Sequence, residues 1–88
     1  MYRVELNKSA EKELSKLDSQ TQKIILTFLE QDVESENPRL YGKVLKYNWA
    51  GHWRYDLGKY RIICKIKDDV CIVLVIKIGH RREIYRKN

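Results

Sequence analysis

The stretch that decides the fold is Trp53-Arg54-Tyr55-Asp56-Leu57-Gly58-Lys59-Tyr60-Arg61-Ile62-Ile63-Cys64. Apolar and polar side chains alternate through most of both halves, which is the pattern of half-buried strands. Gly58-Lys59 between the halves suits a two-residue hairpin with glycine at the first turn position. The resulting cross-strand pairs are Leu57 with Tyr60, Asp56 with Arg61, and Tyr55 with Ile62.

One face of this hairpin is apolar and the other is charged, because directly opposed residues of two strands share a face. The apolar face, which we expect helices to cover, carries Trp53, Tyr55, Leu57, Tyr60, Ile62 and Cys64. The opposite face, called the open face below, carries Arg54, Asp56, Arg61 and Lys65.

A third strand is predicted over residues 70–78, which are rich in Val and Ile. A two-residue turn before this strand would bury Lys77, and an unpaired buried charge is costly. We therefore predict a three-residue turn, which places Ile72, Leu74 and Ile76 on the helix side. Lys77 and Arg81 then join the open face. The apolar residues expected on that face are Ile63, Val73 and Val75.

The N-terminal part of the chain predicts one strand and two helices. Tyr2, Val4 and Leu6 alternate with polar residues, as in a strand. Ala10, Leu14 and Leu17 then follow a helical period, so a short helix is expected over residues 8–17, capped by Asn7 or Ser9.

A second helix begins where Ser19-Gln20-Thr21-Gln22 matches a capping box. Its apolar face carries Ile25, Phe28, Leu29 and Val33. Asn37-Pro38 ends it, because proline disfavours helical geometry in the preceding residue. Residues 38–51 are predicted to form a basic loop that carries Arg39, Lys43 and Lys46.

This order, β-α-α-β-β-β, predicts an α+β fold with two helices on one face of an antiparallel sheet. At 88 residues the chain is expected to form a single domain over residues 1–88. The longest apolar run, Val70 to Ile76, is too short for a membrane helix, and no signal peptide is recognised at the N-terminus. Cys64 and Cys71 fall on opposite faces of the predicted sheet, which argues against a disulfide and favours a reducing cytoplasm.

The net charge of +6 is divided unevenly along the chain. Residues 1–36 have a net charge of −3, whereas residues 37–88 have a net charge of +9. Such a field favours a polyanionic partner, nucleic acid above all. A basic surface kept for solubility is the alternative, although solubility does not require the signs to separate.

The open face collects the candidate binding residues. They are Arg54, Arg61, Lys65, Lys77 and Arg81, with Arg82 and Tyr85 just beyond the last strand, and Lys43 and Lys46 in the loop. Arginines hold phosphate oxygens in a bidentate fork, and aromatic rings stack on unpaired bases. A solvated face with salt bridges explains the pattern equally well. The sequence contains no metal-ligand spacing and no cofactor motif, so no metal or cofactor is expected.

Residues 53–63, followed by Gly79-His80-Arg81-Arg82-Glu83-Ile84-Tyr85, resemble the RelE/ParE superfamily of bacterial and archaeal toxins. The chain looks more like the RelE branch, whose members are endoribonucleases that cut mRNA in the ribosomal A site. The resemblance implies a metal-independent cleavage in which the RNA 2′-hydroxyl attacks the adjacent phosphate. It also implies a cytoplasmic toxin whose partners are the ribosome, mRNA and an antitoxin.

The resemblance implies a role for each matching residue. Arg61 would clamp the phosphate, Arg81 would stabilise charge or help to protonate the leaving group, and Tyr85 would orient the nucleotide. Arg54 falls where the family often has a basic residue. Asp56 departs from the family, which commonly has a basic residue there. Asp56 is either the general base or a structural partner of Arg61, and His80 is a rival base.

Two alternatives of a different kind follow from the same resemblance. A ParE-like toxin would bind and poison DNA gyrase without catalysis, and a degenerate member would only bind its antitoxin. The antitoxin is expected to be RelB-like, acidic and partly disordered, and to form a hetero-oligomer with this chain.

Overall fold

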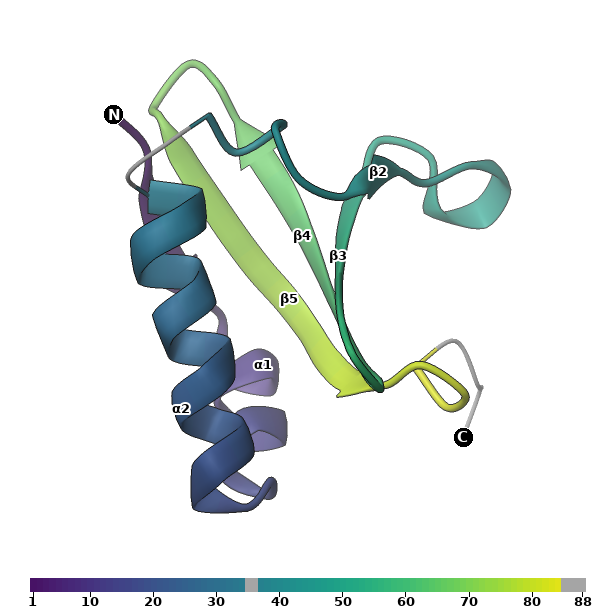
Figure 1. The fold of residues 1–88 in the computed structure, drawn as a ribbon. Coiled ribbons are helices and arrows are strands. Elements are labelled where there is room, and N and C mark those ends of the chain that lie inside the picture. The colour runs from purple at the N-terminus through teal and green to yellow at the C-terminus, as the bar shows by residue number, and fades with distance from the viewer. Residues whose placement is uncertain (35–36, 85–88) are drawn as a thin grey trace.

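The computed structural model describes residues 1–34 and 37–84. Its strands are β1 (Arg3–Leu6), β2 (Lys43–Val44), β3 (Trp53–Leu57), β4 (Tyr60–Lys67) and β5 (Ile72–His80). Its helices are α1 (Lys8–Ser15), α2 (Ser19–Phe28), the π-helical turn η1 (Leu29–Glu34) and the 3-10 turn η2 (Tyr47–Trp49). The strands form one sheet in the order β1-β5-β4-β3-β2, with α1 and α2 on one of its faces (Figure 1).

The predicted fold class is confirmed, with two differences in the sheet. The sheet is mixed, because β1 runs parallel to β5, with Arg3 opposite Ile72. Residues 38–51 are not only a loop, since Lys43 and Val44 form the edge strand β2 beside β3. Alternation along a strand says which side chains are buried, but it carries no information about the direction of a neighbour distant in sequence.

The helix starts follow from their capping residues. Asn7 caps α1, its side chain accepting a hydrogen bond from the Ala10 amide at 2.8 Å. The capping box predicted from Ser19 is wrong, because Asp18 is the N-cap of α2. The Asp18 carboxylate accepts from the backbone and hydroxyl of Thr21, at 3.2 and 2.5 Å. A carboxylate here is also favoured by the helix dipole.

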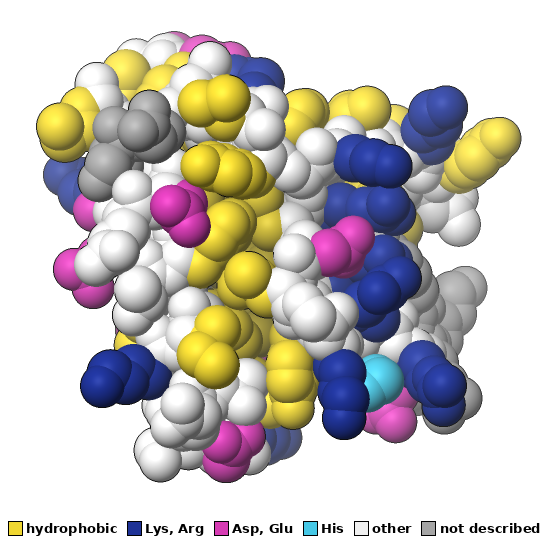
Figure 2. All heavy atoms as spheres, in the orientation of Figure 1, with side chains coloured by type: hydrophobic (Ala, Val, Ile, Leu, Met, Phe, Trp, Pro, Cys, Tyr) yellow, Lys and Arg dark blue, Asp and Glu magenta, His cyan; other side chains and the backbone are white. Residues whose placement is uncertain are grey.

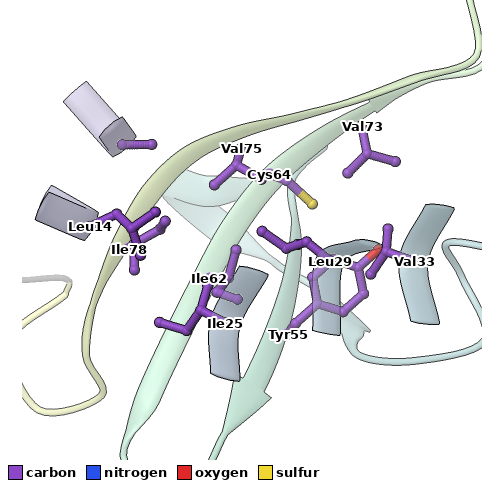
Figure 3. Close-up of a cluster of buried hydrophobic side chains, with 11 residues drawn as sticks. Leu14, Ile25, Leu29, Val33, Tyr55, Ile62, Cys64, Val73, Val75 and Ile78 are labelled. Carbon is purple, nitrogen blue, oxygen red and sulfur yellow. The ribbon is translucent and has the colours of Figure 1, made fainter. Parts of the chain in front are cut away.

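The main core lies between the two helices and the sheet (Figure 3). The buried residues of this core are Ala10, Leu14, Ile25, Leu29, Val33, Tyr55, Ile62, Cys64, Val73, Val75 and Ile78. The hairpin register is the predicted one, with Leu57 opposite Tyr60. All six hairpin residues that were expected to face the helices are buried in this core or pack against it.

The predicted register of the last strand is wrong. The turn before β5 has four residues, 68–71, with Lys67 opposite Ile72. Val73 and Val75 therefore face the helices in place of Ile72, Leu74 and Ile76. A shift in pairing at Ile63/Cys64 then bulges β5, and this bulge returns Lys77 to the open face, opposite Ile63.

The open face is partly covered by a second apolar cluster. Its buried members are Leu45, Ile63 and Ile84, and Trp49 and Ile76 pack against them. Ile63 is therefore covered from the open side by the segment after β2 and by the turn after β5. This cluster holds the basic loop and the C-terminal turn on the same face of the sheet.

The sequence predicted no disulfide and no membrane helix. Cys64 is buried and Cys71 is exposed, and both are free thiols. Among residues 1–34 and 37–84, no helix combines the length and the apolar character needed to cross a bilayer.

Candidate nucleic-acid interface

A hollow of about 630 Å³ lies where the β3–β4 hairpin meets the end of β5. The residues that line it are Gly58, Lys59, Arg61, His80, Arg81 and Arg82. Four of the six are Lys or Arg, and no carboxylate of the described chain lines the hollow. A cavity lined in this way attracts an anion with several oxygens, such as a phosphate diester.

The backbone holds the arginines of the hollow in place. The Arg81 amide donates to the Lys59 carbonyl at 2.8 Å, which ties the end of β5 to the hairpin turn. The amides of Glu83 and Ile84 both donate to the His80 carbonyl, at 2.9 and 3.0 Å. Ile84 is then anchored in the second apolar cluster, so Arg81 and Arg82 project from a turn fixed at both ends.

Arg61 forms the floor of the hollow and is only 9% exposed. Its Nε donates to Asp56 Oδ1 at 2.6 Å, and its Nη2 donates to Asp56 Oδ2 at 3.4 Å. Burial raises the pKa of Asp56, but the hydrogen bond from Arg61 and the charges of Arg61, Arg54 and Arg81 bring that pKa below its ordinary value. Asp56 is therefore ionised at neutral pH and hydrogen-bonded to Arg61.

Arg54 lies beside this pair on β3. Its Nε is 3.7 Å from Asp56 Oδ2, close enough for an ion pair but too far for a hydrogen bond. That nitrogen is buried and has no hydrogen-bond partner in the part of the chain that the structure describes. A buried donor without an acceptor is costly.

His80 enters the hollow from the end of β5. Its Nδ1 accepts a hydrogen bond from the Arg82 amide at 3.2 Å, and its ring meets Tyr60 edge to face with centroids 6.0 Å apart. In the neutral ring this bond leaves the proton on Nε2. His80 in this geometry donates a hydrogen bond from Nε2, and neither ring nitrogen is free to accept a proton as the base considered from the sequence would.

The predicted residues fall into two groups. Arg61, His80, Arg81 and Arg82 line the hollow, with Asp56 and Arg54 next to it on β3. Lys43 extends this row, because it lies opposite Arg54 across β2 and β3. Tyr85 lies outside the described residues.

Three predicted binding residues lie apart from the hollow. Lys46 is on the loop before η2, and Lys65 is on β4 opposite Leu74, towards the other end of the sheet. Lys77 lines a different hollow of about 290 Å³, together with Glu13 and Glu83. Lys59 was not predicted from the sequence, because a residue at a hairpin turn belongs to neither face of the sheet.

Several of the basic residues gather on one side of the molecule. Figure 2 shows Lys and Arg side chains in a column down the side of the molecule that carries β2, β3 and the C-terminal turn. A strip of hydrophobic side chains runs beside this column, between α2 and β3.

Comparisons with known proteins agree with this fold. The family described as the ParE toxin of the type II toxin-antitoxin system parDE matches residues 4–85. Toxin RelG of Mycobacterium tuberculosis is 30% identical over 86 residues, which cover 98% of each chain. The chain therefore belongs to the RelE/ParE superfamily of toxins of type II toxin-antitoxin systems.

Within that superfamily the chain is RelE-like. The toxin-antitoxin complex RelBE2 of M. tuberculosis contains a chain that is 29% identical, with a TM-score of 0.85 over 91% of this chain and 98% of that one. The isolated RelE toxin of E. coli is 25% identical, with a TM-score of 0.73 over 97% of this chain and 92% of that one.

Proposed function

We propose that this toxin is an endoribonuclease that cuts mRNA in the ribosomal A site and so inhibits translation in the cytoplasm. The observation that carries the proposal is the hollow in which Arg61, Arg81 and Arg82 converge with His80. RNA cleavage needs positive charge around a phosphorus that gains negative charge in the transition state. The RelE-like fold supports the same reaction class.

The proposed reaction is an attack by the RNA 2′-oxygen on the adjacent phosphorus. A new bond forms between that oxygen and phosphorus, and the bond to the 5′-oxygen of the next nucleotide breaks. Arg61, held by Asp56, clamps the non-bridging oxygens, and Arg81 stabilises their developing charge. His80 donates a hydrogen bond from Nε2 to the leaving 5′-oxygen, which takes its proton from water, and the proton of the 2′-hydroxyl passes to water. Tyr85, which matches the family motif, orients the nucleotide.

The general base is the missing part of this site. Arginine stays protonated at any working pH, and the ionised Asp56 is engaged by Arg61. A site without a strong base depends on the alignment of its substrate, a contribution that can be large. We propose that the ribosome supplies this alignment, so that free RNA is cut poorly.

The test is translation in a cell-free extract, followed by primer extension on the mRNA. The proposal expects new 5′ ends within the reading frame when ribosomes are present, and almost none with the same mRNA alone. Blocked translation beside intact mRNA would overturn it. Rapid cutting of purified mRNA by catalytic amounts of protein would contradict the ribosome dependence.

The family description favours a second candidate, because it names the ParE toxin. A ParE-like toxin would bind and poison DNA gyrase, so a supercoiling assay with purified gyrase separates the two. Inhibited supercoiling with intact mRNA in the extract would establish this alternative. Growth without inhibition on expression would instead indicate a member that only binds its antitoxin.

We also propose a RelB-like antitoxin as the partner, in a hetero-oligomer. The matched RelBE2 structure is itself a toxin-antitoxin complex. A partner whose charge complements the net charge of +9 of residues 37–88 is acidic. A partly disordered chain that folds as it binds can also cover the hydrophobic strip beside the basic column (Figure 2). Titration of the purified antitoxin into this protein at low and high salt tests the charge complementarity. Equal association rates at both salt concentrations would exclude long-range electrostatic attraction between the two proteins.

A further inference from the structure

Tyr47 is the most exposed aromatic residue that the structure describes, with 92% of its surface accessible. It is also one of two non-glycine residues described with a positive φ, at 59°. A side chain other than glycine, asparagine or aspartate in this left-handed region costs roughly 1–2 kcal/mol. Neither its exposure nor its backbone conformation is explained by packing, and such strain gathers at functional sites.

The loop that carries Tyr47 is rigidly built. The Leu45 amide donates to the His52 carbonyl at 2.9 Å, and the Ala50 amide donates to the Tyr47 carbonyl at 3.0 Å. His52 Nδ1 lies 3.1 Å from the Trp49 carbonyl oxygen. Leu45 and Trp49 anchor both sides of the turn in the second apolar cluster. The Tyr47 ring therefore projects from a fixed support, in the loop that extends beyond β2 in Figure 1.

This loop continues the basic surface that contains the hollow. Lys43 lies opposite Arg54, and Asp56 of the same strand binds Arg61 in the floor of the hollow. Two strand spacings, roughly 10 Å, separate β2 from β4. Lys46 precedes Tyr47 directly, so the ring is accompanied by a cation. A single strand whose phosphate enters the hollow can extend over this row of cations to the loop.

We infer that Tyr47 is a base-stacking residue, which binds an unpaired nucleobase of RNA while the lysines and arginines beside it bind the phosphates. This inference rests on the proposed action on RNA. Because the backbone that carries the ring is held by hydrogen bonds, little backbone entropy is lost when a base stacks on it. Stacking of this kind is tolerant of sequence, because every base has a π-face. The stacked nucleobase belongs either to mRNA or to ribosomal RNA, and the stacking interaction with the Tyr47 ring is the same in both cases.

The experiment measures binding of two RNAs at several salt concentrations. One is a single-stranded oligonucleotide with 2′-O-methyl groups, which cannot be cut, and with one fluorescent 2-aminopurine. The other is the small ribosomal subunit without mRNA. Tyr47→Asn removes the ring but suits the left-handed backbone. It is expected to bind one or both RNAs roughly 5- to 100-fold more weakly, without a lower melting temperature.

Three comparisons make the result specific. Tyr47→Phe keeps the ring and is expected to bind like the parent protein, with the same fluorescence quenching. Lys46→Ala is expected to reduce the magnitude of the slope of log affinity against log salt concentration by about 1, because one phosphate contact is lost. Tyr47→Asn is expected to leave that slope unchanged. Ile24→Ala, at an exposed apolar residue on α2, is the matched surface control.

Equal affinities of Tyr47→Asn and the parent protein for both RNAs would overturn the inference. Absence of binding to either RNA by the parent protein would overturn it too. The proposed cleavage is judged separately, by primer extension in the extract. Loss on the oligonucleotide alone assigns the base to mRNA, and loss on the ribosomal subunit alone assigns it to ribosomal RNA.

Discussion

Asp56 and Arg61 face each other across the β3–β4 hairpin, and the Arg61 Nε lies 2.6 Å from Asp56 Oδ1. The carboxylate reaches Arg61 from β3, and Arg61 is one of the residues that line the hollow. Asp56 therefore restricts the orientation of the arginine that we assign to the phosphate. We therefore assign Asp56 as a positioning residue. A general base would need a carboxylate oxygen that is free to accept a proton, whereas the Asp56 carboxylate already accepts hydrogen bonds from Arg61.

Substitution of Asp56 tests this assignment. Asp56→Asn keeps an oxygen that can accept from Arg61, so mRNA cleavage in the extract is expected to fall by about tenfold or less. The pH dependence of cleavage between pH 5 and 8 is expected to stay unchanged. Loss of a general base typically costs 10²- to 10⁴-fold. A loss of that size for Asp56→Asn, at an unchanged melting temperature, would make Asp56 the base.

Arg81→Ala tests the charge contact at the end of β5. Removal of a transition-state contact of this kind typically costs ~10²–10³ in rate, so growth inhibition and mRNA cleavage are expected to be lost. The fold should persist, because the Arg81 side chain is exposed and only its amide is tied to Lys59. Lys67→Ala, at the far end of β4, is the control and should remain toxic. An unfolded Arg81→Ala protein would contradict the assigned role.

The pH dependence of stability is expected to involve Asp68. Hydrogen bonds from Arg39 and Tyr2 lower the pKa of Asp68 to about 2. Arg39 binds both carboxylate oxygens at 2.9 Å, joining the segment after η1 to the β4–β5 turn. Because the folded pKa is below the unfolded value near 3.9, this contribution is present above pH 4 and is lost as the pH falls towards 2.

Thermal melting of Asp68→Asn against the parent protein checks this expectation. The parent protein should melt at the higher temperature at pH 6, and the difference should narrow between pH 4 and pH 2. A difference that is the same at pH 6 and pH 2 would show that the ionised form of Asp68 is not what stabilises the fold.

Two glycines with positive φ provide a matched pair for stability. A Cβ on Gly42 would lie 2.0 Å from the Arg54 carbonyl oxygen, whereas a Cβ on Gly51 meets nothing within 4 Å. Their φ angles are similar, at 80° and 88°. Gly51→Ala should cost roughly 1–2 kcal/mol from the backbone alone, and Gly42→Ala should cost more, because β2 must move away from β3. Equal unfolding free energies would contradict the close approach.

The helix-facing side of the hairpin and its register followed from the sequence, because both depend on local features. Alternation in residues 53–64 and the Gly58-Lys59 turn are enough to set Asp56 opposite Arg61. The apolar faces of the two helices were equally readable, since a helical period depends only on near neighbours. Arg61 could be placed for the same reason, whereas the predicted placement of Arg81 relied on a register of β5 that was wrong and that the bulge offset.

Tertiary structure alone decided the features that join distant parts of the chain. The direction of β1, the bulge in β5 and the cluster of Leu45, Ile63 and Ile84 arise from contacts between residues far apart in sequence. Lys59 and Tyr47 became candidates only once the turns that carry them had been placed against the sheet. Periodicity reports which side chains a segment buries, but the partner that buries them is selected by packing over the whole domain.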